Sequence, residues 1–336
     1  MVLAPPVVNV EKFTPVPTQT PLPSPTATPT TSPLMTQTPT PPPSPTPDIF
    51  KDRTIDALAA RSYGGGVLED LGVLPATSNN FTRRLFRFRS DGLNMFGFIN
   101  IPKGEGSFPV IFMFHGYVDP KEYLTLDYST RYADALANSG YIVLHPNLRG
   151  YAPSPAAENS LGVGDTVDAL NLLALVRQQS GSDGLLKNAD ASRIGLWGHS
   201  MGGGIVMRIL IIDSGIDAAV LYASIHANED INLTHFDEDG RGYEKLLASE
   251  AVLEKLSPLN YLERITAPVS IHQGGNDRVV PPKWSAFLCE YLENLDKPVE
   301  CLEYADQPHT FQNSGDKQFI ANMIRFFDEK VKENGD

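Results

Sequence analysis

Between residues 84 and 331, apolar strand-like runs alternate with longer amphipathic stretches, and this alternation is the strongest constraint on the fold. Runs such as 109–115 and 141–146 are continuously apolar, which is typical of strands that are buried on both faces of a sheet. Stretches such as 162–179 and 316–331 have the length and periodicity of helices. The alternation predicts an α/β fold with crossover connections and a mostly parallel, doubly wound sheet of about eight strands with flanking helices.

The other expected elements follow the same pattern. Strands at 84–90 and 93–101 are joined by Asp91-Gly92, a pair typical of tight hairpins, so the sheet should begin with an antiparallel edge. Residues 225–266 interrupt the alternation, and we interpret them as a small, partly helical insertion over the site. Further strands are expected at 193–200, 218–224, 267–274 and 299–305, and further helices at 129–139, 201–212 and 282–295.

The first 47 residues differ in composition from the rest of the chain. They hold 15 of the 28 prolines and 11 threonines, and their only charged residues are Glu11 and Lys12. Proline fixes φ and removes a backbone donor, and few apolar side chains are available for burial, so no regular structure is expected. The segment is either a tail without a role or an extended stalk that spaces a catalytic domain from a surface anchor. We therefore divide the chain into a disordered Thr/Pro-rich stalk or linker (1–47), a lead-in (48–83) and a catalytic domain (84–333).

The balance of charge excludes several classes of partner. The chain has 27 basic and 40 acidic residues and a formal net charge of −13, which argues against binding to nucleic acid or to an anionic membrane surface. No stretch approaches the ~18 apolar residues that a membrane-spanning helix needs. The histidines do not cluster with cysteines or carboxylates at metal-binding spacing, so we expect no metal and no cofactor.

Two features bear on location. Thr/Pro-rich stalks are typical of exported proteins, whereas the first ten residues lack the basic start and apolar core of a signal peptide. We expect an extracytoplasmic protein, secreted or surface-anchored through the stalk, whose signal segment is absent from this chain.

Cys289 and Cys301 lie in consecutive elements, which often pack side by side, so they form either a disulfide or two buried free thiols.

A G-x-S-x-G motif, Gly198-His199-Ser200-Met201-Gly202, lies between the expected strand at 193–200 and the expected helix at 201–212. In that context the motif forms a nucleophile elbow, a tight turn that exposes the serine at the head of a helix. The alternative is a glycine-rich packing turn without a catalytic role. We predict that Ser200 is a nucleophile and that Gly198, His199 and Gly202 shape its elbow.

A serine hydroxyl needs a base that takes its proton, and elbow folds order the triad as serine, acid, histidine. His309 follows the strand at 299–305, at the sheet edge where parallel sheets form their ligand sites. Asp277 directly follows an earlier strand and should orient the imidazole. Asp306 is nearer to His309 in sequence, but it would lie at the end of the same strand rather than opposite the ring. We therefore predict Asp277 as the acid.

The oxyanion of an acyl-transfer reaction needs two N–H donors. One should be the backbone N–H of Met201, because it directly follows the nucleophile. The other should be the backbone N–H of Tyr117, which lies in the loop after the strand at 109–115.

Several segments together resemble the α/β-hydrolase superfamily. Within it, the chain is most similar to the catalytic domain of the prolyl oligopeptidase family and to its stand-alone, dienelactone-hydrolase-like relatives. Ser200, Asp277 and His309 each fall on a family motif, so the resemblance implies a Ser-Asp-His triad. The family's His-Gly-Gly-Pro is replaced by His115-Gly116-Tyr117-Val118, at the second expected oxyanion donor. The matching segments, within about residues 84–330, are FMFHGY, HPNLRGY, GDTVDALNLL, RIGLWGHSMGG, GGNDRVVP and HTF.

The resemblance implies a serine hydrolase that cleaves carboxylic ester or peptide bonds through an acyl-enzyme, without a cofactor. It favours a peptidase acting on short peptides. Residues 48–83 are too few to build the β-propeller that filters substrates in some members, which favours an esterase acting on small-molecule esters. The alternatives are an acyltransferase that uses the same triad and a non-catalytic binding protein of this fold. The sequence does not indicate an oligomeric state.

Overall fold

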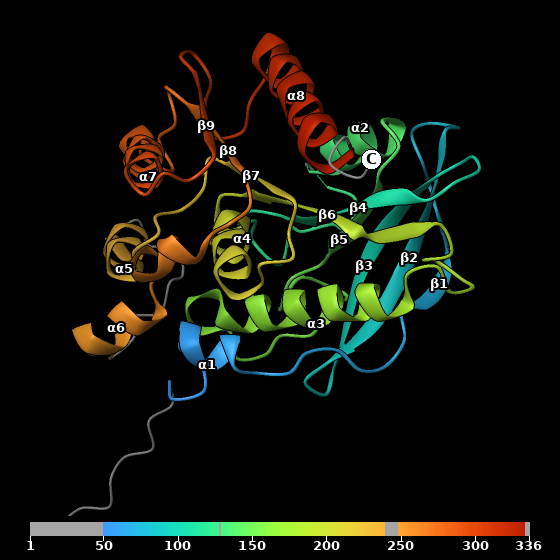
Figure 1. The fold of residues 1–336 in the computed structure, drawn as a ribbon, viewed down its shortest axis with the longest axis horizontal. Helices are drawn as coiled ribbons and strands as arrows, with labels where there is room; N and C mark the ends of the chain where they lie inside the picture. The colour runs from blue at the N-terminus through green and yellow to red at the C-terminus, as the bar shows by residue number, and fades with distance from the viewer. Residues whose placement is uncertain (1–49, 128, 239–247, 333–336) are drawn as a thin grey trace, which may run out of the picture. The chain divides into compact units, whose positions relative to one another are not determined.

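A computed structural model describes residues 50–127, 129–238 and 248–332. The predicted stalk, residues 1–47, lies outside these ranges. In the described part, a nine-stranded sheet has helices on both of its faces (Figure 1). None of the helices in these ranges is both long enough and apolar enough to cross a membrane.

The bounds of the elements agree with most of the expected ranges to within a few residues. The strands are β1 (Glu69–Leu74), β2 (Phe81–Ser90), β3 (Leu93–Pro102), β4 (Phe108–Phe114), β5 (Ile142–Pro146), β6 (Ala189–His199), β7 (Ala218–Tyr222), β8 (Val269–Gly274) and β9 (Val299–Tyr304). The α-helices are α1 (Ile55–Ala59), α2 (Thr130–Asn138), α3 (Val163–Gln179), α4 (Met201–Ile212), α5 (Glu229–Glu238), α6 (Glu250–Leu256), α7 (Pro282–Asn294) and α8 (Asn313–Phe327). Shorter helical segments are η1 (Ser160–Gly162), η2 (Pro258–Arg264) and the π-helical η3 (Asp328–Lys332).

The strand order is β1-β2-β3-β5-β4-β6-β7-β8-β9. Pairs from β1 to β5 are antiparallel, and those from β5 through β4 to β9 are parallel, which confirms a mostly parallel sheet with an antiparallel edge. The sheet has nine strands rather than the expected eight or so, because β1 lies in the segment interpreted only as a lead-in. The side chains of β1 are exposed or half-buried, so this edge strand lacks the apolar run that marks the others.

The sheet is doubly wound. The buried apolar side chains of α3, α4 and α7 pack on one face, and those of α2 and α8 pack on the other (Figure 1). Because β6, β7, β8 and β9 run parallel, their carboxyl ends lie along one edge of the sheet. The predicted catalytic residues follow three of these strand ends.

The insertion between β7 and β8 contains α5, α6 and η2, and its residues 239–247 lie outside the described ranges. Phe236 of α5 packs in a small apolar cluster with Val280 and Trp284. His235 contacts the carbonyl oxygen of Val279 through its Nε2, at 2.9 Å. The insertion is therefore attached to the loop that follows β8, which is the loop that contains Asp277.

The two cysteines form a disulfide between Cys289 of α7 and Cys301 of β9. Of the two alternatives left open by the sequence, the structure contains the disulfide. The bond ties helix α7 to β9, the strand that leads into the loop of His309.

Candidate active site

Ser200 lies between the last residue of β6 and the first residue of α4, with φ +54° and ψ −116°. A positive φ is uncommon and strained for a residue other than glycine. Backbone hydrogen bonds hold this conformation, and two of them are short. The N–H of Ser200 donates to the carbonyl oxygen of Tyr222 at 2.9 Å, and the N–H of Gly203 donates to the carbonyl oxygen of Ser200 at 2.9 Å. Ser200 therefore lies in a strained turn between strand and helix, and this turn is held by β7 and by the first turn of α4.

The glycines of the motif permit a close approach between backbones. A Cβ at Gly202 would lie 2.0 Å from the carbonyl oxygen of Phe114, and one at Gly198 would lie 2.4 Å from the carbonyl oxygen of Gly202. Because these neighbours are backbone atoms, they cannot turn away as a side chain could. The head of α4 therefore packs against the end of β4, directly beside the loop that contains Tyr117.

Asp277 follows β8 and His309 follows β9, and the two side chains meet. His309 Nδ1 lies 2.7 Å from Asp277 Oδ2, with the carboxylate side chain 0% exposed and the imidazole 16% exposed. Asp277 Oδ1 accepts hydrogen bonds from the backbone N–H groups of Val279, at 2.8 Å, and Val280, at 2.9 Å. The carboxylate is thus fixed by its own loop and directed at the histidine, which is the arrangement that a general base requires.

The loop of His309 is also bound to the elbow. The buried His199 contacts the carbonyl oxygen of His309 through its Nε2 at 3.1 Å, and the two ring centroids lie 4.6 Å apart. Burial, together with the nearby His309, lowers the pKa of His199 well below its ordinary value, so the ring is neutral and donates through Nε2–H. The N–H of Phe311 donates to the hydroxyl of Tyr222, whose carbonyl holds Ser200. His199 and Tyr222 therefore bring the serine turn and the histidine loop side by side.

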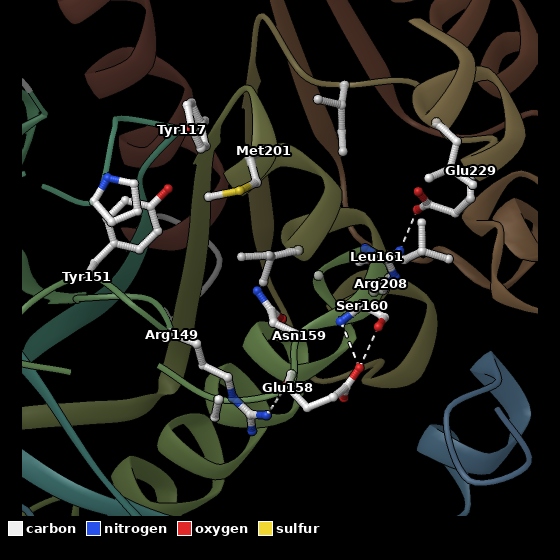
Figure 2. Close-up of a pocket in the computed structure, with 16 residues that line it drawn as sticks. Tyr117, Arg149, Tyr151, Glu158, Asn159, Ser160, Leu161, Met201, Arg208 and Glu229 are labelled. Carbon is white, nitrogen blue, oxygen red and sulfur yellow. Dashed lines mark hydrogen bonds and ion pairs between the residues drawn. The ribbon is translucent and has the colours of Figure 1, made fainter. Parts of the chain in front are cut away.

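A cavity of about 430 Å³ opens next to the elbow (Figure 2). Both residues predicted for the oxyanion hole, Tyr117 and Met201, line it, and the Tyr117 side chain is half-exposed. The side chains of Ser200, Asp277 and His309 do not belong to its lining, and Met201, the residue after Ser200, is the part of the turn that the cavity reaches. Apolar walls come from α4, η1 and the insertion, with Ile205, Leu161, Ile225 and Leu233.

An arginine holds one end of the cavity wall at residues 158–162 (Figure 2). Arg149 donates through Nη1 to the carbonyl oxygen of Glu158 at 2.6 Å. It also forms a bidentate pair with Asp168, with Nε at 2.7 Å and Nη2 at 2.9 Å from the carboxylate oxygens. The guanidinium therefore lines the cavity while its charge is paired with Asp168.

A second arginine holds the other end of this wall. Arg208 of α4 donates through Nη2 to the carbonyl oxygen of Leu161 at 2.8 Å and pairs with Glu229 of α5 (Figure 2). Both charged side chains are buried. Burial raises the pKa of Glu229, and the positive charge of Arg208 opposes that rise. The pair joins α4, the cavity wall and the insertion, and it leaves no net charge there.

The structure brings together the predicted acid and base directly and places the predicted nucleophile beside them. It adds two residues that the sequence reasoning missed, Tyr222 and Gln273, each of which lies near the carboxyl end of a strand. Tyr222 ends the apolar strand β7, and a polar group at that position is a signal that could have indicated it. β8 also contains Ser270 and His272, so Gln273 has no comparable signal. The oxyanion role of the Tyr117 and Met201 N–H groups stays a prediction.

Comparison with known proteins gives consistent matches. The profile of the prolyl oligopeptidase family matches residues 127–334. The uncharacterized peptidase YtmA of Bacillus subtilis is 27% identical over 197 residues, which cover 56% of this chain and 73% of that protein.

Solved structures share the fold at low identity. A puromycin-hydrolyzing peptidase of Mycobacterium tuberculosis superposes with a TM-score of 0.63 at 21% identity, over 77% of this chain and 40% of that one. An acetyl xylan esterase from Paenibacillus sp. R4 superposes with a TM-score of 0.61 at 21% identity, over 82% of this chain and 92% of that one. The chain thus spans less than half of the mycobacterial peptidase but nearly the full length of the esterase.

Proposed function

The chain belongs to the prolyl oligopeptidase family of serine hydrolases, and from that premise we propose that Ser200, Asp277 and His309 form its catalytic triad. The observation that carries this proposal is the hydrogen bond between His309 Nδ1 and the buried Asp277 carboxylate, at the sheet edge that also bears the strained turn of Ser200. A carboxylate that accepts from Nδ1 leaves Nε2 unprotonated in the neutral ring, which is the tautomer that a general base needs.

In the reaction, Ser200 Oγ attacks the carbonyl carbon of the substrate while His309 takes the hydroxyl proton. The backbone N–H groups of Met201 and Tyr117 stabilise the oxyanion that forms. His309 then donates its proton to the leaving group, and an acyl-enzyme remains on Ser200. Water resolves the acyl-enzyme by the same steps in reverse order.

We propose that the substrates are small esters or short peptides. The cavity beside Met201 has a volume of about 430 Å³, which suits a group of moderate size. Its arginines are paired with acids and its other walls are largely apolar, so it favours an uncharged group next to the reacting carbonyl. The Bacillus relative is described as a peptidase and the Paenibacillus neighbour as an acetyl xylan esterase, and both kinds of bond suit this machinery.

We also propose an extracytoplasmic location, with residues 1–47 as a spacer ahead of the catalytic domain. The disulfide between Cys289 and Cys301 supports this location, because disulfides persist mainly in oxidising compartments. The Thr/Pro-rich composition of the first 47 residues supports the spacer role.

A panel of short acyl esters and aminoacyl amides tests the proposed function. We expect hydrolysis by the purified protein and a loss of kcat of about 10⁴-fold or more in Ser200→Ala, because the nucleophile is removed. Ser192→Ala, an exposed serine on the same strand β6, is the matched control and should keep full activity. A Ser200→Ala variant that retained most of the activity would show that the triad assignment is wrong.

A further inference from the structure

The carboxylate oxygen that faces His309 has a second partner. Gln273 Nε2 lies 3.0 Å from Asp277 Oδ2, the oxygen that also lies 2.7 Å from His309 Nδ1. Gln273 is a buried residue of β8, just before the strand ends. Two donors therefore share the one oxygen on which the orientation of the imidazole depends.

A neighbouring helix sets the orientation of the Gln273 amide. The buried Ser285 of α7 donates from Oγ to Gln273 Oε1 at 2.7 Å. Because the amide oxygen is held by this hydroxyl, the NH₂ group must face Asp277. Gln273 Nε2 also donates to the carbonyl oxygen of Gly274 at 3.2 Å, which favours the same orientation of the amide.

A fully buried carboxylate needs donors, since an ionised group that loses water without new hydrogen bonds is strongly destabilised. Val279 and Val280 satisfy Oδ1, and Gln273 satisfies one lone pair of Oδ2. These three donors fix the plane of the Asp277 carboxylate and leave the other lone pair of Oδ2 for His309. Without Gln273, Asp277 Oδ2 keeps His309 as its partner, but the plane of the carboxylate is less firmly fixed and the imidazole is oriented less well for proton transfer.

We propose that Gln273 is a positioning residue, which orients the Asp277 carboxylate toward His309, and that Ser285 fixes the orientation of its amide. The inference rests on the proposed triad, because it concerns how that triad is held. It adds Ser285 and Gln273 to a hydrogen-bonded series that runs from α7 through β8 to the acid and the base.

The charged and titratable groups around this series bear on its pH dependence. On the triad side, His199 contacts the His309 carbonyl and His235 contacts the loop of Asp277 through the Val279 carbonyl. On the other side, Gln273 and Ser285 line a cavity of about 330 Å³ that also borders Glu290, Glu293 and Glu303. These three glutamates are exposed and are the same in the wild type and in all the variants below, so they provide a constant background.

The first test is the pH profile of kcat/KM for Gln273→Met, which keeps the length of the side chain and removes the donor. We expect a loss of about tenfold in kcat/KM, mainly in kcat, because a hydrogen bond to a charged group is lost. The acid limb should move to higher pH, since an oxygen with one donor fewer stabilises the imidazolium form of His309 more strongly. A packing role alone would lower stability without moving the limb.

Gln273→Glu keeps the size of the side chain and should change the pH profile more clearly. Two carboxyl groups about 3 Å apart cannot both ionise readily, so they would share one proton. At a pH where the two carboxyl groups share this proton, the introduced carboxyl group can donate a hydrogen bond to Asp277, and activity should be retained. As the pH rises and the proton leaves, activity should fall along an alkaline limb that is absent in the wild type.

Ser285 provides a pair of variants that leave Gln273 in place. Ser285→Ala releases the amide oxygen and should reproduce part of the shift of the acid limb, whereas Ser285→Thr keeps the hydroxyl and should restore the wild-type profile. If Gln273→Met does not fold, this pair decides the question. Unchanged pH profiles in the folded Gln273 and Ser285 variants would overturn the inference. The proposed function would instead fail if wild-type protein showed no hydrolysis and no reaction of Ser200 with a serine-directed fluorophosphonate.

Discussion

Ser200 has a backbone conformation that costs on the order of 1–3 kcal/mol for a residue other than glycine. Such strain persists only where the surroundings fix the turn, and here Tyr222 and Gly203 do so through backbone hydrogen bonds. The turn puts the hydroxyl at the head of α4, where free N–H groups of the first helical turn favour a negative charge. The strain is thus consistent with a nucleophile and with an oxyanion site beside it.

The elbow leads to a prediction about Gly202. In Gly202→Ala, the new methyl group would lie 2.0 Å from the carbonyl oxygen of Phe114, so α4 must move away from β4. We expect a loss of stability of about 3 kcal/mol or more, as for other severe overpacking, and a loss of activity of at least tenfold. Thermal unfolding and ester hydrolysis would measure both effects.

Gly204→Ala is the matched control for this prediction. Its nearest neighbour would be the Cδ1 atom of Ile225, at 2.7 Å, which is the end of a flexible side chain rather than backbone. This variant should lose much less stability and keep most of its activity. Equal effects of the two substitutions would contradict the role assigned to the contact between Gly202 and Phe114.

The sequence predicts Ser200, Asp277 and His309 because each has a local signature: an elbow motif or a position just after an apolar strand. Gln273 and Tyr222 have no such signature. Gln273 accepts a hydrogen bond from Ser285 and donates one to Asp277, and the Tyr222 hydroxyl accepts one from the N–H of Phe311. These contacts depend on how distant strands and loops pack. Hydrogen-bond partners that lie this far apart in sequence cannot be predicted from the spacing of residues along the chain.

At the scale of elements, apolar runs predict the central strands well, because strands buried on both faces consist mainly of apolar residues. The expected helix at 201–212 has the same bounds as α4 in the structure. Edge elements are harder to predict. β1 contains Glu69, Asp70 and Gly72 and exposes much of its surface, so packing against β2 rather than local pattern defines it.

The disulfide between α7 and β9 gives a prediction at this scale. It joins residues 12 positions apart, and closing such a loop contributes about 3 kcal/mol by restricting the unfolded chain. We expect reduction to lower the free energy of unfolding by about that amount. Urea unfolding with and without reductant would measure the difference.

The double variant Cys289→Ser/Cys301→Ser is the control. It should unfold like the reduced wild type and should not respond to reductant. A wild-type protein whose free energy of unfolding did not change on reduction would show that the disulfide does not form in solution or does not stabilise the fold.

At the scale of the whole molecule, buried neutral histidines make stability depend on pH. Burial lowers the pKa of His115 to about 4 and, mainly by the same cause, the pKa values of His145 and His272 to about 3. In the unfolded chain these groups titrate near 6.5. Since the unfolded state binds protons first, their stabilisation is complete above about pH 6.5 and is lost as the pH falls.

We therefore expect the free energy of unfolding to decrease between about pH 7 and about pH 5, by up to about 2 kcal/mol for each of the three histidines. Asp165 acts in the opposite direction, because burial raises its pKa to about 6, and burial also raises the pKa values of Asp217 and Glu229. Burial lowers the pKa values of His199 and His226 as well, so the histidines outnumber the carboxyl groups that oppose them. Urea unfolding at the two pH values would measure the change. Replacing His272 by Gln should flatten it, and equal or greater stability at the lower pH would contradict the assignment.

We propose above that Ser200 is an activated nucleophile in a triad with Asp277 and His309. Labelling of the full chain with a fluorophosphonate, followed by peptide mapping, tests it most directly, because the reagent reacts with serines that have been activated by a base. We expect a single adduct on Ser200 that is lost in Ser200→Ala and forms much more slowly in His309→Ala. An adduct on another serine, or no adduct on folded protein, would contradict it.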